Sequence, residues 1–363
     1  MGIYKKVFKM KIKILVIYTQ LDKQITGGQV YDNRLFEKIK KDERYELDFL
    51  TDDMLRSQNK VLFNFTYLCE YFRVRKYDII LTNSRLYTRL FLLFFFLRWT
   101  SKVKLIAVHH HFDFLGQSKK IFKFLELNFL RMLYATIIPS PYIKDLFATL
   151  FPKKKVLYAQ LSVEKAINNV SANKDDKCFN LVTVGTIEKR KGTSYIIDAI
   201  SKIKDKTNVK FTLSIVGKVV EEDYYNNLVE QIKNAGLTDN VKFLGRLSNE
   251  ELSEVYSKAN CFAFGSQLEG YGMVLLEAMS YGLPLIAFNN TAMPYTVKNG
   301  HNGFLVENKN VEEFSNAILK LIEDPQLCKK LAEGSLNDFK NLRTLEDLSS
   351  DFDSILNNKF EKI

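Results

Sequence analysis

Two glutamates eight residues apart frame a glycine-containing loop in the C-terminal half of the chain. The segment reads Glu269-Gly270-Tyr271-Gly272-Met273-Val274-Leu275-Leu276-Glu277. Its glycines allow a tight turn and the close approach of a ligand, and the apolar residues predict a short helix that Gly282 and Pro284 end. Backbone N–H groups at a helix start bind anions, phosphate above all. The two carboxylates would flank such a site and accept hydrogen bonds from sugar hydroxyls.

A basic turn follows an apolar, strand-like run earlier in the chain. The run 181–185 ends in a glycine, and Arg190 and Lys191 precede a helical pattern that begins near Gly192. A strand, a turn and a helix in this order place Arg190 and Lys191 at the carboxyl edge of a sheet, where open α/β folds bind ligands. Taken singly, the glutamates fit solvated charges and the basic pair fits an exposed turn. Their combination indicates a site for a phosphorylated sugar.

Together these residues resemble the retaining glycosyltransferases of family four, which have the GT-B fold. That family carries an E-x7-E motif like Glu269 to Glu277, with the same Glu-Ala-Met and Gly-x-Pro around its end. It also carries a strand ending in Val-Gly before a basic turn and Lys-Gly, as at residues 184–192. Many members have an arginine directly after that first glycine, where this chain has Thr186. Others have an arginine just before the lysine, so the resemblance implies that Arg190 makes the pyrophosphate contact.

The resemblance extends over nearly the whole chain. It implies an α/β fold of the GT-B class, with two Rossmann-like domains whose parallel sheets face each other across a cleft. The apolar run 14–18 fits a first strand, and Gly27 and Gly28 open the helical pattern after it. Family members carry a Gly-Gly there that faces the donor diphosphate. Because a Gly-Gly pair alone is typical of any turn, its place between strand and helix carries this assignment.

Length and patterning indicate the same architecture. A chain of 363 residues suits two domains. Apolar runs alternate with helical patterns in both halves, which indicates parallel sheets covered by helices. We expect strands at 77–81, 103–108, 136–139, 181–185, 211–216, 241–244, 261–264 and 285–288. We place an acceptor-binding domain at 1–168 and a nucleotide-sugar-binding domain at 169–344, with a C-terminal helix at about 345–363 packing back on the first domain.

Charge divides unevenly between the two halves. The chain contains 53 Lys and Arg and 42 Asp and Glu, which gives a net charge of +11. Residues 1–165 hold 30 of the basic and 15 of the acidic residues, a net charge of +15, so the rest of the chain has a net charge of −4. A basic domain favours an anionic partner, and near an anionic leaflet each Lys or Arg contributes about 1 kcal/mol. The apolar run 90–97, bounded by Arg89 and by Arg98 and Trp99, is too short to span a bilayer. It fits either a buried helix or a helix lying at a membrane surface.

Three consecutive histidines end the predicted strand at 103–108. On a strand His109, His111 and Asp113 would share a face, which suits a metal site and makes a metal-dependent hydrolase one rival interpretation. Many members of the resembled family have a histidine at the end of this strand, near the 6-position of the donor sugar, and His109 matches it by register. A third interpretation is that the three histidines only cap the strand end.

The cysteines and the first residues bear on localisation. Cys69, Cys178, Cys261 and Cys328 lie far apart without a C-x-x-C, which fits a reducing compartment and argues against a zinc site. The lysine-rich start precedes only a short apolar run, which fits a strand better than a secretory signal. We therefore expect a cytoplasmic protein, with peripheral contact at the inner face of the cell membrane.

The expected activity is metal-independent, retaining transfer of a sugar from a UDP- or GDP-linked donor to a saccharide or lipid-linked saccharide, in surface polysaccharide or glycolipid biosynthesis. The resemblance assigns donor binding to Gly27, Gly28, Gly185, Arg190, Lys191, Gly217, Glu269, Gly270, Tyr271, Gly272, Met273, Val274 and Glu277, and catalytic roles to His109, Arg190, Lys191 and Glu269. Arg190 and Lys191 would stabilise the departing phosphates. Glu277 would bind the ribose, and Glu269 would hold the donor sugar and favour a developing oxocarbenium charge. The resemblance further implies that the leaving phosphate deprotonates the acceptor on the same face of the sugar.

Other classes remain as alternatives. A nucleotide-sugar epimerase with the GT-B fold would show acid-base residues facing the sugar in place of the E-x7-E motif. A nucleic-acid-binding protein would use the basic half, but the sequence contains no recognition motif, and we expect no nucleic-acid partner. An inactive relative serving as a scaffold would not need Glu269, Glu277 and Lys191, which are all present.

Overall fold

The computed structural model describes residues 11–18, 27–51, 67–112, 120–152, 155–158, 178–343, 347 and 361–362. The chain forms two compact units, which are Met1–Ser162 with Arg343–Ile363 (unit 1) and Val163–Leu342 (unit 2). The domain boundaries predicted at 168/169 and 344/345 lie outside the described residues, as does most of the helix predicted at about 345–363. Its described end, Glu361–Lys362, is a short strand, because it pairs with an edge strand of unit 1.

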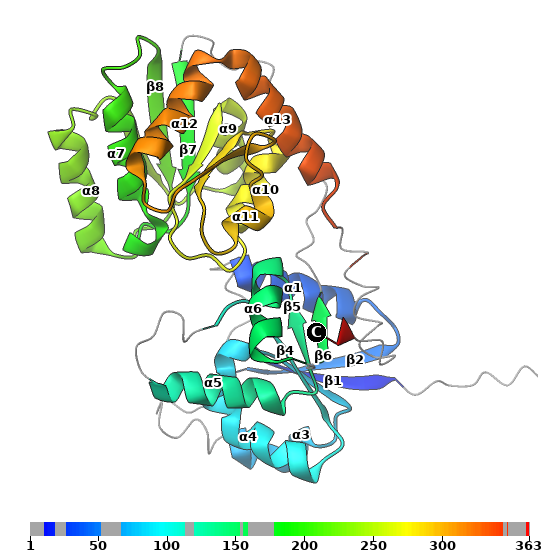
Figure 1. The fold of residues 1–363 in the computed structure, drawn as a ribbon. Coiled ribbons are helices and arrows are strands. Elements are labelled where there is room, and N and C mark those ends of the chain that lie inside the picture. Colours follow the sequence, from blue (N-terminus) through cyan, green and yellow to red (C-terminus); the bar gives the residue numbers. More distant parts are fainter. Residues whose placement is uncertain are drawn as a thin grey trace, which may run out of the picture. The chain divides into compact units, whose positions relative to one another are not determined.

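Unit 1 is built on a seven-stranded sheet of order β13-β6-β5-β4-β3-β1-β2. Its strands are β1 (Ile12–Tyr18), β2 (Tyr45–Thr51), β3 (Ile79–Asn83), β4 (Lys104–Val108), β5 (Ala135–Ile138), β6 (Lys155–Tyr158) and β13 (Glu361–Lys362). Between them lie α1 (Gly27–Lys40), α3 (Tyr71–Val74), η2 (Ser84–Leu86), α4 (Tyr87–Thr100), α5 (Lys120–Met132) and α6 (Pro141–Leu150). All pairs are parallel except β13 with β6 (Figure 1). The central strands are continuous apolar runs because helices cover both of their faces.

Unit 2 is built on a six-stranded, wholly parallel sheet of order β12-β11-β10-β7-β8-β9. Its strands are β7 (Cys178–Val184), β8 (Lys210–Val216), β9 (Val241–Gly245), β10 (Cys261–Phe264), β11 (Leu285–Phe288) and β12 (Gly303–Val306). The helices are η4 (Lys189–Lys191), α7 (Thr193–Ile203), α8 (Glu222–Asn234), α9 (Asn249–Lys258), α10 (Met273–Ser280), α11 (Met293–Thr296), α12 (Val311–Glu323) and α13 (Pro325–Lys340). Helices α7 and α12 pack side by side over one face of the sheet (Figure 1). The two Rossmann-like α/β domains predicted from the sequence are confirmed.

Strand order fixes where unit 2 can bind a ligand. The chain runs outward from β7 through β8 to β9, then crosses back to β10 on the other side of β7. Connections from β7 and β10 therefore leave toward opposite faces, and open α/β sheets bind ligands at such a switch point, beyond the carboxyl ends of the strands. The basic turn follows β7 and the glutamate loop follows β10, so both predicted motifs lie at that switch point.

The apolar run 90–97 forms most of α4, and its side chains divide between core and surface. Leu90, Leu93, Phe94 and Leu97 are buried, whereas Phe95 and Phe96 on the same helix are exposed. The run is thus a core element that also has an exposed apolar side. No helix within the described ranges is long and apolar enough to span a bilayer.

Adjacent phenylalanines of α4 provide a test of this division. Phe94→Ala should lower the free energy of unfolding of the domain by about 3–5 kcal/mol, because it empties a site where Phe94 stacks on Phe129 with 5.0 Å between ring centroids. Phe95→Ala, the matched control at a 47% exposed position, should change it by no more than about 0.5 kcal/mol. Chemical denaturation followed by circular dichroism measures both. Equal effects would contradict the assignment of the two faces.

Candidate functional site

Glycines bring the two loops of unit 2 together. At Gly192 the backbone is left-handed (φ 64°), and a Cβ there would lie 1.9 Å from the carbonyl oxygen of Gly265, the residue after β10. At Gly217, after β8, a Cβ would lie 1.8 Å from the carbonyl oxygen of Gly185. A side chain at Gly192 would force the basic turn and the glutamate loop apart, and one at Gly217 would separate the loop after β8 from the turn after β7.

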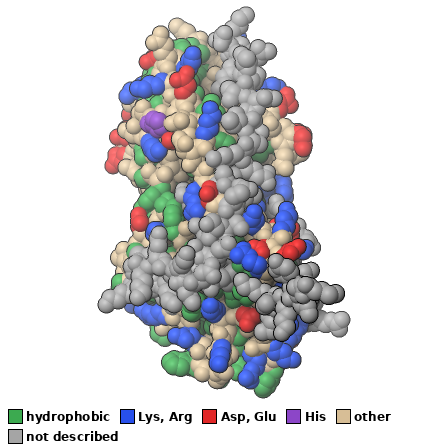
Figure 2. All heavy atoms as spheres, turned by 90° about the vertical axis from the view of Figure 1, so that its right-hand side faces the viewer, with side chains coloured by type: hydrophobic (Ala, Val, Ile, Leu, Met, Phe, Trp, Pro, Cys, Tyr) green, Lys and Arg blue, Asp and Glu red, His purple; other side chains and the backbone are tan. Residues whose placement is uncertain are grey.

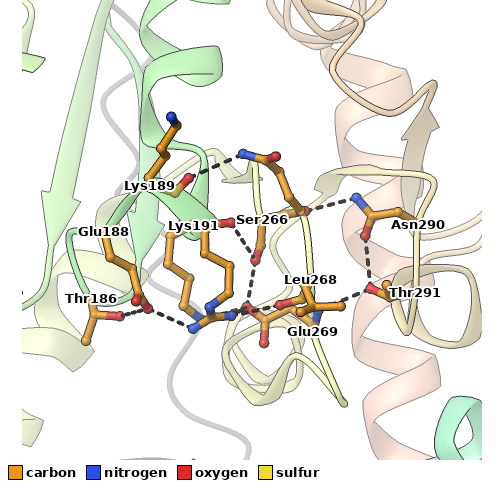
Figure 3. Close-up of polar contacts among 11 residues, drawn as sticks. Thr186, Glu188, Lys189, Lys191, Ser266, Leu268, Glu269, Asn290 and Thr291 are labelled. Atoms are coloured by element: carbon orange, nitrogen blue, oxygen red, sulfur yellow. Dashed lines mark hydrogen bonds and ion pairs between the residues drawn. The ribbon is translucent and has the colours of Figure 1, made fainter. Parts of the chain in front are cut away.

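An ion pair joins the two predicted motifs. Lys191 donates from Nζ to Oε1 of Glu269 at 2.6 Å (Figure 3), and the two side chains are only 16% and 12% exposed. The Lys191 ammonium also lies 5.7 Å from the centre of the Phe264 ring. Because burial weakens screening by water, this pair is a strong local electrostatic feature. The structure therefore brings two residues 78 positions apart into one polar cluster.

Arg190 is held beside this pair by neighbours on both loops. Its guanidinium donates to the Leu268 carbonyl oxygen at 2.7 Å and to Oε1 of Glu188 at 2.7 Å, and it lies 3.4 Å from Glu269. The Thr186 hydroxyl donates to the same Glu188 oxygen at 2.7 Å (Figure 3). Thr186, which departs from the arginine common in the resembled family, thus helps to fix the carboxylate that positions Arg190.

The glutamate loop is fixed by hydroxyl groups that the sequence analysis did not identify. Ser266, which is fully buried, donates from Oγ to Glu269 at 2.7 Å. The backbone N–H of Glu269 donates to Oγ1 of Thr291 at 3.1 Å (Figure 3). Thr291 has φ 41°, an unfavourable conformation for a β-branched residue, and such strain is retained mainly at functional sites. Ser266 was recognisable only as the second residue after a strand, and Thr291 had no signal in the sequence.

Helix α10 starts at this loop without a side-chain cap. Its N-cap, Gly272, is left-handed (φ 82°) and, having no side chain, makes no cap bond to the N–H groups of the first turn. Backbone N–H groups at a helix start can bind anions, and anion binding at the start of α10 stays a prediction. The loop and first-turn residues Gly270, Tyr271, Met273 and Val274 are half-buried.

The second glutamate of the motif lies one turn into α10. Glu277 is exposed, and its Oε2 accepts a hydrogen bond from the Tyr256 hydroxyl at 3.2 Å. Tyr256 is buried in α9 and stacks on Tyr281 with 5.0 Å between ring centroids. Burial and the Glu277 carboxylate raise the pKa of Tyr256 well above its usual range. Tyr256 therefore acts as a fixed donor that orients Glu277.

In unit 1 the structure separates the roles of the consecutive histidines. His109 is completely buried, with its ring against Phe112 and Phe147 and its Nδ1 2.8 Å from Oγ of Ser84. Its Nε2 has no hydrogen-bond partner among the described residues. The sugar contact assigned to His109 by register therefore falls on a side chain in the core, and a one-residue difference brings His110 to the sheet edge instead.

His110 belongs to a polar cluster at the carboxyl ends of β1, β3 and β4. Its Nε2 lies 2.7 Å from Oδ1 of Asp32, which is fully buried in α1. The other oxygen of Asp32 accepts from the Tyr18 hydroxyl at 2.8 Å and from Nδ2 of Asn83 at 2.7 Å. Burial, together with the Asp32 carboxylate, raises the pKa of Tyr18. The cluster holds the His110 ring, 15% exposed, in one orientation.

The Gly27 and Gly28 pair stands at the start of α1, as the sequence predicts. A Cβ at Gly28 would lie 3.3 Å from the His110 ring, so this glycine leaves room for the histidine. Asp113 lies outside the described residues, and within the described ranges no group of three or more His, Cys, Asp or Glu is arranged to hold a metal ion.

Two Rossmann-like domains, one of which carries the Arg190 and Lys191 turn and the start of α10 at a topological switch point, define an α/β protein of the GT-B type. A profile of the family described as glycosyl transferases group 1 matches residues 164–337. The matched part, just under half of the chain, is therefore similar to members of that family.

The chain is also similar to individual proteins. It is 31% identical over 142 residues, 39% of this chain and 36% of the relative, to the O-antigen chain mannosyltransferase B of Escherichia coli. It spans about half the length of other curated relatives that it matches. A sucrose-phosphate synthase from Thermosynechococcus elongatus has the same fold, with a TM-score of 0.81 and 17% identity over 96% of this chain and 99% of that one. The Anabaena protein HepE, solved with UDP and glucose, also has this fold, with a TM-score of 0.75. It is 19% identical to this chain, and the match covers 95% of this chain and 99% of that one.

The burial of His109 predicts a pH effect on stability. Burial, with a smaller effect of the neighbouring His111 and His110, lowers the pKa of His109 well below 6.5. Below about pH 6.5 the unfolded chain therefore binds a proton that the native protein excludes, so stability falls as the pH falls, by up to about 1.4 kcal/mol per pH unit. When the pH is lowered from about 7.5 to about 5.5, the free energy of unfolding of His109→Gln should fall by about 1.4 kcal/mol less than that of the unmodified protein. Denaturant titrations at the two pH values measure this difference. Equal losses would contradict the assigned burial.

Proposed function

We propose that the protein is a retaining glycosyltransferase of family four that transfers a sugar from a UDP- or GDP-linked donor. The observation that carries the proposal is the cluster in which Lys191 and Arg190 contact Glu269, on the loop that leads into the start of α10. A diphosphate brings two negative charges, and cations and backbone N–H groups held in advance stabilise them without reorganisation. The UDP bound by HepE, a protein of the same fold, supports a nucleotide donor.

Each side chain of the cluster has a proposed task. Lys191 and Arg190 neutralise the leaving diphosphate, and the N–H groups after Gly272 bind its oxygens. Glu277, oriented by Tyr256, accepts hydrogen bonds from the ribose hydroxyls. Glu269 holds the donor sugar and favours positive charge at the reacting carbon. The leaving phosphate takes the proton of the acceptor hydroxyl on the same sugar face, which gives retention.

The proposed acceptor is a saccharide or a lipid-linked saccharide in surface polysaccharide or glycolipid biosynthesis. The O-antigen mannosyltransferase among the relatives supports such an acceptor, and so does the net charge of +15 in residues 1–165. We propose a cytoplasmic protein with peripheral contact at an anionic membrane and no nucleic-acid partner. For the sugar contact in unit 1 we propose His110, because its ring is partly exposed and held by Asp32, whereas His109 is not accessible.

Two substitutions in the cluster test the donor site. Lys191→Ala and Glu277→Ala should each lower transfer by about 10²–10³-fold, because the first removes charge from the diphosphate site and the second removes the ribose acceptor. Sugar transfer from radiolabelled UDP- and GDP-sugars measures the effect, with circular dichroism to confirm the fold. Lys189→Ala is the matched control, since its side chain points away from the cluster (Figure 3), and it should retain nearly full activity. Near-normal turnover in Lys191→Ala or Glu277→Ala would remove the assignment.

A chelator tests whether the proposed chemistry depends on a metal. Transfer in excess EDTA should equal transfer in untreated buffer, because the Lys and Arg side chains and the helix start supply the positive charge that a metal supplies in other sites. Initial rates with and without chelator, followed by readdition of Mg²⁺ or Mn²⁺, make the comparison. Complete loss that a metal restores would contradict metal-independent transfer.

A further inference from the structure

Three helices of unit 1 expose large apolar side chains. Phe72 in α3 is 72% exposed, Phe95, Phe96 and Trp99 in α4 are 47%, 43% and 77% exposed, and Ile121 and Phe124 in α5 are 56% and 60% exposed. We call these six residues the apolar face. Among the described residues every exposed Phe or Trp side chain belongs to it. Scattered single exposures are ordinary, but six large side chains on adjoining helices mark an interaction surface.

The three helices are firmly joined beneath this face. Helices α4 and α5 pack through their buried sides, where Phe94 stacks on Phe129. The Tyr71 hydroxyl of α3 lies 2.6 Å from Oγ1 of Thr100 at the end of α4. The exposed residues of α4 lie opposite its buried stripe. A folded scaffold therefore presents the apolar face, which needs no rearrangement to make contact.

Positive charge accompanies the apolar face. The exposed residues Arg73, Arg75, Arg98, Lys120 and Lys123 lie on or directly after the same helices. Neither α3 nor α4 contains an Asp or Glu, and Glu126, the one acidic residue of α5, is buried. Glu70, directly before α3, pairs with Arg73 at 3.2 Å. Figure 2 shows hydrophobic and Lys or Arg side chains together at the end of unit 1 that carries α3 and α4 in Figure 1.

We propose that the apolar face docks on an anionic lipid surface, with its Phe, Ile and Trp side chains at the headgroup level and the Lys and Arg side chains on lipid phosphates. Aromatic and basic side chains on one helical surface suit this interface. A second copy of the chain fits less well, because a symmetric contact would bring two basic rims together. The proposal specifies the proposed peripheral membrane contact and is independent of the donor site.

The chain carries its own reporter for this contact. Trp99 is its single tryptophan and lies on the apolar face. Vesicles of equal parts phosphatidylcholine and phosphatidylglycerol should shift its fluorescence to shorter wavelength, and brominated acyl chains should quench it. Phosphatidylcholine vesicles alone should give little change. Raising the salt from about 50 to about 500 mM should weaken the response, because it screens the charge contribution.

Substitutions separate the apolar and charged contributions. In vesicle flotation, Phe72→Ala with Phe124→Ala should reduce binding about tenfold. Arg98→Gln with Lys123→Gln should reduce binding to anionic vesicles about tenfold or more. Val229→Ala, at an exposed apolar position of α8 in unit 2, is the matched control and should bind normally. Each variant should keep its affinity for UDP or GDP in calorimetry, so a failed donor assignment would be recognised separately.

Three outcomes would overturn the proposal. The first is that anionic vesicles neither change the Trp99 emission nor bind the protein in flotation. The second is a shift that grows with protein concentration without lipid, which would identify a second copy of the chain as the occupant. The third is equal binding of the double variants and the unmodified protein, which would place membrane contact elsewhere on the chain.

Discussion

The ion pair between Lys191 and Glu269 is the interaction on which the site of unit 2 depends. It forms only because Gly192 and Gly265 let two loops meet with no room for a Cβ. Those loops leave neighbouring parallel strands at the point where strand order reverses, so the sheet topology decides which residues meet. Removing either partner would leave a poorly hydrated charge, which costs about 3–5 kcal/mol in buried pairs. The pair therefore links the architecture of the sheet to the chemistry of the site.

Two carboxylates balance the cations of this cluster. Glu188 holds Arg190 and Glu269 holds Lys191, while Ser266 and Thr291 fix the loop that carries Glu269. A diphosphate would compete with these carboxylates for the same donors, and the start of α10 would provide further N–H groups. Positive charge is thus already in place before a ligand arrives, and preorganisation of this kind is the main way in which such sites stabilise developing charge.

Apolar runs allowed the sequence to predict nine strands whose ends lie within about three residues of the observed ones, because buried parallel strands are continuously apolar. The strands β2, β6, β12 and β13 were not predicted, since they are short or interrupted by polar residues such as Glu46 and Asp48. Contacts across loops could not be predicted either. His109 is buried in the core whereas the next residue, His110, is partly exposed, and the sequence does not distinguish them. The hydroxyls of Tyr256, Ser266 and Thr291 contact Glu277 or Glu269 only because the tertiary structure brings these residues together. The exposed residues of α5 and α3 likewise had no sequence signal, because burial depends on packing.

A crystal structure of the protein with bound UDP would test the central claim most directly. Our account predicts diphosphate oxygens within hydrogen-bonding distance of Lys191 Nζ and of the backbone N–H groups that follow Gly272, with the ribose hydroxyls on Glu277. A nucleotide bound elsewhere, with the pair between Lys191 and Glu269 untouched and the start of α10 empty, would contradict it.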